Sequence, residues 1–174
     1  MTEGIQLDAV HSMRAAGTED EALLWRLFSE AKAPWMAAVG LDETQLWPLI
    51  EMQFRGRKMT YAAQFPNAAD SVLLDDQGVA VGRLLVDRRP DAWRVVDIAI
   101  LMAHRGKGLG TIALKECQRQ CEEAGARLEL QVDQGNPARR LYERLGFHAI
   151  REDAIAAEMV WNAPGQDRRD AVSE

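Results

Sequence analysis

The chain has 174 residues, 47% of them hydrophobic, and a formal net charge of −6. This length and composition fit one domain with a sizeable core, and no apolar run is long enough to span a membrane. The acidic balance argues against nonspecific nucleic-acid binding and mildly favours a cationic partner. Residues 1–10 lack the basic and apolar regions of a signal peptide, so we expect a cytoplasmic protein.

The chain is predicted to begin with a strand, a helix and a loop. Residues 10–16 are predicted to form the strand. In the helix that follows, Thr18 is the expected N-cap and Glu21 completes a capping box. Pro34 is expected to end this helix, which leaves residues 35–41 as a loop.

A longer helix and a hairpin are predicted next. The helix spans residues 42–65 and is closed by Pro66. Pro48 is awkward inside it, because proline lacks a backbone donor and clashes with the preceding turn. We therefore expect either a kink there or a short turn before a helix that begins at Pro48. Residues 71–90 then form the clearest hairpin, with a glycine-containing turn at 76–78.

The second half of the chain alternates strands with helices. An apolar strand at 92–102 precedes a helix at 108–123, for which Gly125 is the expected end cap. A strand at 126–133 then leads to a short helix within 136–147. In this helix Asn136 is the expected cap, Pro137 the first helical residue and Gly146 the terminator.

The order of these elements predicts the fold class. With closing strands at 148–153 and 156–162, it indicates one mixed α/β domain over residues 1–162. Residues 163–174 are poor in apolar side chains and are expected to be disordered. Cys117 and Cys121 lie four apart on a predicted helix, where the geometry suits neither a disulfide nor, without nearby ligands, a metal site. We expect buried packing cysteines in a reducing compartment, and no bound metal.

A glycine-rich segment between a predicted strand and a predicted helix is the first functional signal. Gly106, Gly108 and Gly110 alternate with other residues there, and Arg105 and Lys107 add positive charge. Glycines let a phosphate approach the backbone, and the start of a helix favours negative charge. The spacing matches neither a dinucleotide fingerprint nor a P-loop. A sharp structural turn with incidental basic residues is the alternative interpretation.

A second motif gives the glycine segment a specific interpretation. The segment matches the pattern [QR]-x-x-G-x-[GA], and residues 136–147, "NPARRLYERLGF", follow it after a predicted helix and strand. Together the two motifs resemble the GNAT superfamily of N-acetyltransferases, which use acetyl-coenzyme A. The resemblance implies a central, mixed but mostly antiparallel sheet flanked by helices. The matching residues are Arg105, Gly108, Gly110, Asn136, Leu141, Tyr142, Gly146 and Phe147.

The resemblance also implies how acetyl-CoA is held. The backbone of the glycine segment would surround the pyrophosphate, and the central strand would bulge away from its neighbour to bind the pantetheine arm. Asn136 would cap its helix and hydrogen-bond to the cofactor arm. The implied cofactor-binding residues are Ile98, Ala99, Ile100, Arg105, Gly106, Lys107, Gly108, Leu109, Gly110, Asn136 and Tyr142.

Two residues are candidates for proton transfer. Tyr142 matches the family's usual general acid, which protonates the leaving thiolate; packing in the core is its alternative role. Asp97 is the best candidate base, because a charge within an apolar strand needs a reason. An ion pair with Arg83 or Arg94 is the alternative for Asp97.

Other groups near these candidates have weaker claims. The family often has glutamate where Gln131 stands, which leaves Glu129 as a further candidate base. His104 is expected to be a solvated loop residue. A proline is frequent in the family at the position of Met102, and we expect no functional loss from its absence.

The acceptor is expected to contact the first two helices and the segment between them. Aromatic side chains there could stack on a cationic amine but also suit a core, and the basic residues suit a solvated face, an acidic group on the acceptor, or the 3′-phosphate of coenzyme A. These residues are Trp35, Met36, Trp47, Phe54, Tyr61, Arg55, Arg57 and Lys58.

The sequence therefore predicts an N-acetyltransferase that uses acetyl-CoA and acts on a primary amine of a small molecule or peptide by direct attack. A domain that binds acyl-CoA without catalysis, as a sensor or interaction module, is the alternative, and a different nucleotide-binding protein is a third interpretation. We expect no nucleic-acid or membrane partner. A homodimer is compatible with this interpretation, while the acceptor, the acyl preference and the oligomeric state stay open.

Overall fold

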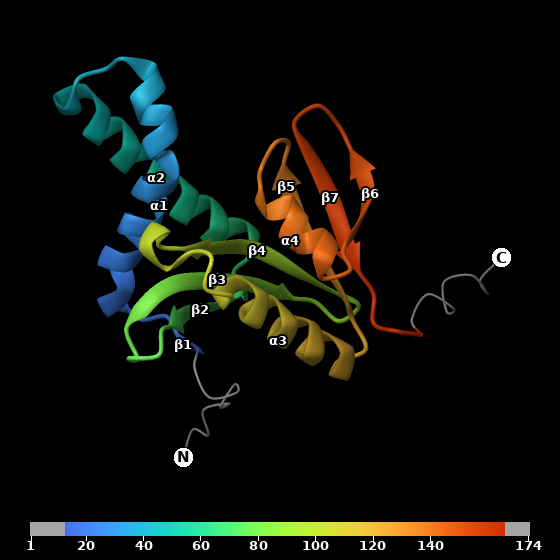
Figure 1. The fold of residues 1–174 in the computed structure, drawn as a ribbon. Helices are drawn as coiled ribbons and strands as arrows, with labels where there is room; N and C mark the ends of the chain where they lie inside the picture. The colour runs from blue at the N-terminus through green and yellow to red at the C-terminus, as the bar shows by residue number, and fades with distance from the viewer. Residues whose placement is uncertain (1–12, 166–174) are drawn as a thin grey trace.

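The computed structural model describes residues 13–165, and they form one sheet covered by helices (Figure 1). The seven strands lie in the order β1-β2-β3-β4-β5-β7-β6, and every neighbouring pair is antiparallel except β4 with β5. This confirms the expected mixed and mostly antiparallel sheet. The strands are β1 (Met13–Ala15), β2 (Ala69–Leu74), β3 (Ala80–Arg88), β4 (Ala92–Ile100), β5 (Arg127–Asp133), β6 (His148–Glu152) and β7 (Ala156–Trp161).

Four α-helices and two 3₁₀ turns accompany the sheet in the described part of the chain. Helices α3 and α4 contribute to the main hydrophobic cluster with strands β2 to β5 and β7. Helices α1 and α2 pair as a helical hairpin that extends past the ends of the strands in Figure 1. The helices are α1 (Glu21–Val39), α2 (Glu43–Gln64), α3 (Leu109–Glu123) and α4 (Ala138–Arg144), and the turns are η1 (Thr18–Asp20) and η2 (Met102–His104).

The sheet divides between β4 and β5. These two strands are paired only from Ala92 to Val95 and from Arg127 to Leu130. The register of β4 against β3 shifts at the same level, so that Val96 is an extra residue in β4. Bulges bend a strand and leave backbone groups unpaired. The expected bulge and splay are thus confirmed, and the second half of β4 has a free edge.

The predicted start and end of the first helix are wrong. Thr18 is not the cap but part of the 3₁₀ turn η1, which Gly17 caps; Asp20 accepts a hydrogen bond from the Gly17 N–H at 2.8 Å. The helix α1 then begins at Glu21. The helix continues through Pro34 to Val39, so residues 35–39 are not a loop. The helix ends instead at Gly40, whose φ of 70° is a conformation that favours glycine.

The second helix also runs past its proline. It begins at Glu43, where the Asp42 side chain accepts from the Gln45 N–H at 3.0 Å, and Pro48 lies within it. The expectation that the helix begins at Pro48 is therefore wrong. Pro48 sits in the second turn, where the missing donor leaves one carbonyl of the first turn without its usual partner. The predicted closure before Pro66 is confirmed.

The remaining boundaries follow the sequence prediction closely. The hairpin of β2 and β3 turns through Gly78, which has a φ of 78°, and α3 ends before Gly125, which has a φ of 68°. Both glycines meet a requirement for positive φ. The closing strands β6 and β7 also form as predicted. Most of the predicted disordered tail, 163–174, lies outside the described residues.

The two cysteines are buried and free, as expected. Burial raises the pKa of Cys117 to about 12 and that of Cys121 to about 11, so both are protonated packing residues at neutral pH. No group of three or more potential ligands for a metal occurs within residues 13–165. In the same range, no helix has the length and apolar content to cross a bilayer.

Candidate active site

A cleft of about 920 Å³ lies at the free edge of β4. Helices α1 and α2 contribute to it from one part of the chain, and the glycine segment, α3 and α4 from another. The residues predicted to bind the cofactor or transfer a proton line this cleft, apart from Lys107 and the further candidate base Glu129. These lining residues are Asp97, Ile98, Ala99, Ile100, Arg105, Gly106, Gly108, Leu109, Gly110, Asn136 and Tyr142.

The glycine segment presents open backbone to the cleft. Gly106 and Gly108 have φ angles of 73° and 86°, and a Cβ atom built on either would meet nothing within 4 Å. Gly108 directly precedes α3, whose first N–H groups have no partners within the helix. No acidic side chain lies in the first turn of α3. The segment therefore has the open backbone and helix dipole that suit a phosphate group.

The free edge of β4 offers further backbone groups. Leu101 donates its N–H to a carbonyl of β3 at 2.9 Å. Because backbone groups alternate along a strand, those of Ala99 also face β3, while those of Ile98 and Ile100 face the open side. Arg105 Nε already donates to the Ile100 carbonyl there at 2.9 Å. The expectation for Ala99 needs correction, because Ala99 lines the cleft while its backbone groups are committed to β3.

Tyr142 belongs both to the core and to the cleft. Its side chain is buried in the main cluster, edge-on to Phe147, and it also lines the cleft. Burial, followed by the charge of Asp97, raises the pKa of the phenol, so Tyr142 stays protonated at neutral pH. Its hydroxyl has no hydrogen-bond partner within residues 13–165, which leaves it free to donate to a ligand.

Asn136 performs the capping role predicted for it. Its side-chain oxygen accepts a hydrogen bond from the Ala138 N–H at 2.9 Å, and its carbonyl accepts from the Arg139 N–H at 3.1 Å. The helix begins at Ala138, one residue later than predicted, and Pro137 precedes it with helical backbone angles. Gly146 terminates the helix with a φ of 86°. These features define the two ends of α4, the helix that carries Tyr142.

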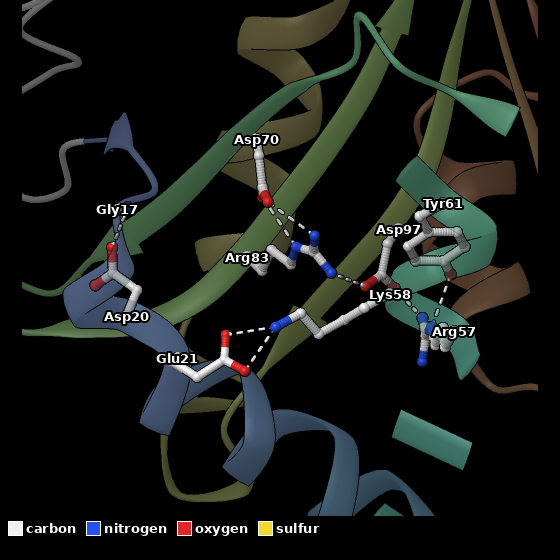
Figure 2. Close-up of polar contacts among 9 residues, drawn as sticks. All are labelled: Gly17, Asp20, Glu21, Arg57, Lys58, Tyr61, Asp70, Arg83 and Asp97. Carbon is white, nitrogen blue, oxygen red and sulfur yellow. Dashed lines mark hydrogen bonds and ion pairs between the residues drawn. The ribbon is translucent and has the colours of Figure 1, made fainter. Parts of the chain in front are cut away.

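Asp97 sits in a network of ion pairs that links α2 to three strands (Figure 2). Arg57 donates to Asp97 at 2.7 Å, and Arg83 donates to its other oxygen at 3.4 Å. Arg83 also donates two hydrogen bonds, of 2.9 and 2.8 Å, to Asp70 on β2. The predicted ion pair with Arg83 is therefore confirmed. Arg94 is the wrong partner, since it donates to Gln131 instead.

The other candidates for the base differ in their position. Glu129 is bound by Arg127 at 2.7 Å and by Arg89 at 3.3 Å, and it is not among the residues that line the cleft. The geometry therefore does not support the prediction that Glu129 could act as the base. His104 does line the cleft, beside the glycine segment.

The predicted acceptor residues separate into two groups. Phe54, Arg57, Lys58 and Tyr61 line the cleft together with Phe28 of α1. The others do not: Trp35, Met36, Trp47 and Arg55 are outside the lining, and Trp47 packs on Trp25 with ring centroids 6.2 Å apart. Arg55 falls off the face of α2 that Phe54, Arg57, Lys58 and Tyr61 share. Trp35, Met36 and Trp47 lie instead near the connection between α1 and α2.

The comparison with known families agrees with this geometry. The acetyltransferase (GNAT) family matches residues 24–147, which is most of the described chain. The protein belongs to the GNAT acetyltransferase family. Curated proteins include no match to the chain.

Solved GNAT structures share the fold at low sequence identity. The PaiA N-acetyltransferase from Thermoplasma acidophilum, in complex with coenzyme A, has a TM-score of 0.67 and 16% identity, over 88% of this chain and 99% of that one. The ribosomal-protein-S18-alanine N-acetyltransferase from Escherichia coli has a TM-score of 0.62 and 17% identity, over 89% and 96% of the two chains. YncA from Salmonella typhimurium, with acetyl-CoA, has a TM-score of 0.56 and 18% identity, over 87% and 93%.

Two contacts of this GNAT site could not be read from the sequence. Glu30 of α1 accepts a hydrogen bond from the Met102 N–H at 2.8 Å, which ties the helical hairpin to the turn before the glycine segment. That bond is the main reason why the pKa of Glu30 is lowered. Arg57 is 40 positions from Asp97. The second contact is the ion pair of these two residues. The position of Arg57 on the cleft face of α2 was the available sequence signal for a functional role, but only the packing of α2 against the sheet reveals Asp97 as its partner.

Proposed function

We propose that this protein transfers the acetyl group of acetyl-CoA to a primary amine of a small molecule or peptide, by direct attack in a ternary complex. One observation carries the proposal. A single cleft joins the open backbone of the glycine segment, the free edge of β4 and the hydroxyl-bearing ring of Tyr142. Phosphate binding, thioester positioning and proton donation thus have suitable groups in one continuous space.

The cleft fits acetyl-CoA in its chemistry. The glycine segment and the start of α3 would bind the pyrophosphate, with positive charge from Arg105 nearby. The outward-facing backbone groups of Ile98 and Ile100 would pair with the pantetheine arm. Bound acetyl-CoA supplies an activated acyl group as a thioester. A backbone N–H aimed at its carbonyl oxygen would stabilise the oxyanion by about 2.7–4 kcal/mol.

Two side chains are proposed to move protons. Tyr142 would donate its proton to the leaving thiolate, a role that suits a phenol whose raised pKa keeps it protonated. Asp97 would accept the proton of the attacking amine, directly or through water. It first has to exchange part of its ion pairing, because two guanidinium groups already occupy its oxygens.

An amine panel tests the proposal. Purified protein is mixed with acetyl-CoA and each amine, and thiol release is followed together with the mass of the product. We expect a mass increase of one acetyl group on at least one primary amine, and tight acetyl-CoA binding in calorimetry. Binding without turnover of any amine would instead support the non-catalytic alternative.

That alternative has one observation in its favour. Asp97 is held by Arg57 and Arg83, as a purely structural carboxylate would be. A sensor or interaction module would keep this network intact and would have no use for the free hydroxyl of Tyr142. Absence of both acetyl-CoA binding and turnover would refute both functions.

A further inference from the structure

The lining of the cleft carries an excess of positive charge, although the net charge of the whole chain is −6. Around Asp97, the lining cations are Arg57, Lys58 and Arg83. Among the described residues, the cleft lining holds two carboxylates, Asp97 and Asp133, against the five basic side chains of Arg57, Lys58, Arg83, Arg105 and Arg144. A further carboxylate, Asp70, lies behind Arg83 and neutralises it. Arg57 therefore shares Asp97 with Arg83, and the partner of Lys58 is Glu21, a surface carboxylate.

Arg57 is held in position by several contacts, but not all of its N–H donors are used. Its Nε donates to the Tyr61 hydroxyl at 2.8 Å and one terminal nitrogen donates to Asp97 at 2.7 Å. Its guanidinium carbon also lies 5.0 Å from the ring centre of Tyr61 and 5.6 Å from that of Phe28. The other terminal nitrogen has no hydrogen-bond partner within residues 13–165. The side chain is 36% exposed and lines the cleft, so a ligand can reach the guanidinium group.

Lys58 is the second available cation. It bonds to Glu21 at 2.6 and 2.8 Å, but both side chains are about half exposed, at 45% and 54%. Such surface pairs contribute little and are easily exchanged. In Figure 2, Lys58 extends from the same helix as Arg57 but toward Glu21, away from the Arg57 guanidinium. Lys58 can therefore reach an anion bound at Arg57 once it releases Glu21.

The position along β4 separates these cations from the cofactor's phosphates. Asp97 and Ile100 are three residues apart, which is roughly 10 Å along a strand, and the glycine segment begins further on. The cations paired with Asp97 therefore lie toward the thioester end of the cleft, where the acceptor must enter. A phosphate of coenzyme A already has Arg105 and the start of α3 at the opposite end.

We infer that the acceptor is an amine that also carries a carboxylate, which Arg57 binds through its free terminal nitrogen with support from Lys58. This inference rests on the proposed function. A guanidinium pairs with a carboxylate through strong, directional hydrogen bonds. As Arg57 turns toward the carboxylate of the acceptor, Asp97 is left with Arg83 and gains a free oxygen for the proton of the amine. Phe28 and Phe54 provide apolar surface for the rest of the acceptor.

Matched substrate pairs test the inference. Each carboxylate-bearing amine is compared with its carboxamide: L-phenylalanine with L-phenylalaninamide, and 4-aminobutyrate with 4-aminobutanamide. We expect kcat/KM to be roughly 10- to 100-fold higher for at least one acid than for its amide, as a hydrogen bond between charged groups implies. The comparison is conservative for the α-amine pair, because the amide has the less basic and more easily deprotonated amine.

Variants then assign the preference to Arg57. Arg57→Gln should abolish the ratio between acid and amide, mainly through a higher KM for the acid, without changing the affinity for acetyl-CoA. Arg57→Lys should keep part of the ratio. Arg55→Gln is the matched control, because Arg55 lies on the same helix, pairs with Glu51 and does not line the cleft. Melting curves show whether each variant folds.

The outcomes separate this inference from the proposed function. Equal or better turnover of the amides, or a preference that survives in Arg57→Gln, overturns the inference. Acetyl-CoA binding with no acetylation of any acid also overturns the inference, while the cofactor assignment stands. Failure of the wild-type protein to bind acetyl-CoA in calorimetry refutes the proposed function itself.

Discussion

At the scale of single residues, the site depends on where a side chain is absent as much as on where one is present. Gly106 and Gly108 leave the backbone of the phosphate-binding segment uncovered, with open space where a Cβ would stand. Tyr142 presents a protonated hydroxyl without a partner among the described residues. Asp97, by contrast, is heavily engaged by Arg57 and Arg83. These three features lead to three separate predictions.

Replacing Gly108 by valine should abolish acetyl-CoA binding. Its φ of 86° strains any other residue, and the new side chain would occupy the space in front of the backbone. Gly78→Val is the matched control, because Gly78 has a φ of 78° and equally open surroundings but lies in the β2–β3 turn. Both variants should lose about 1–2 kcal/mol of stability. Calorimetry that finds unchanged affinity in Gly108→Val would refute the phosphate assignment.

Replacing Tyr142 by phenylalanine should lower kcat by roughly 10²–10⁴-fold, with little change in acetyl-CoA affinity. The ring remains in the core, so the melting temperature should hardly change. Single-turnover rates are the appropriate measurement, because slow product release could hide the effect in steady state. Turnover close to wild type would leave Tyr142 with a packing role alone.

Replacing Asp97 by asparagine should affect both stability and rate. Asparagine cannot balance Arg57 and Arg83, but Arg83 keeps Asp70, so the loss should stay below the roughly 3–5 kcal/mol of a fully broken buried pair. As the proposed base, Asp97 should also control kcat/KM at neutral pH, with partial recovery at high pH where more amine is free. Melting curves and a pH series measure the two effects. A stable and fully active variant is the result that contradicts both roles.

At the scale of elements, close packing between β3 and β4 positions the free edge of β4. Gly82 of β3 is the point of closest approach: a Cβ there would lie 2.9 Å from the Ala99 carbonyl oxygen and 3.1 Å from Leu73. The backbone of β4 could not keep its place beside a larger residue. The close contact with β3 thus fixes the position of β4, whose free edge borders the cleft.

Gly82→Ala should therefore destabilise the protein by about 1–3 kcal/mol and weaken acetyl-CoA binding, because β4 has to shift. Gly56→Ala is the contrasting control. Gly56 lies inside α2 with nothing within 4 Å of a new Cβ, so alanine there should stabilise by about 0.5–1 kcal/mol. Denaturant unfolding measures both changes. A neutral Gly82→Ala would show that β4 tolerates displacement.

At the scale of the whole molecule, stability depends on two buried carboxylates that neighbouring residues hold through hydrogen bonds. Asp20 is bound by Arg14 and the Gly17 N–H, and Glu116 is bound by Arg119 and Gln120. In each case these hydrogen bonds are the main reason why the pKa is lowered. Both carboxylates are buried, so protonation would leave their partners poorly satisfied.

The stability of the protein should fall in acid. A carboxyl group whose pKa is lower in the folded than in the unfolded state stabilises the fold above its unfolded pKa, and this contribution is lost as the pH falls through the folded value. We therefore expect a constant free energy of unfolding from neutrality to about pH 5 and a decline below about pH 4. Urea unfolding across this range measures it, and Asp20→Asn should make the decline shallower. A flat profile down to pH 3 would contradict this account.

The sequence by itself determined the order of most elements, the family and the residues of the glycine segment. These depend on local chemistry: a glycine at positive φ, a capping Asn136, or an alternation of strand and helix signals can be read within a few positions. Local rules failed at Pro34 and Pro48, where packing of α1 against α2, through side chains such as Phe28 and Phe54, outweighs the cost of a proline inside a helix.

Only the tertiary structure decided which charges meet. Arg57 and Asp97 are 40 residues apart and belong to different layers, so no spacing in the sequence relates them. The free edge of β4 likewise exists only because β5 parts from it beyond Leu130. Ion pairing and strand separation depend on distances in space, whereas sequence patterns carry periodicity along the chain. The cofactor end of the site could therefore be read from motifs, and the acceptor end required the fold.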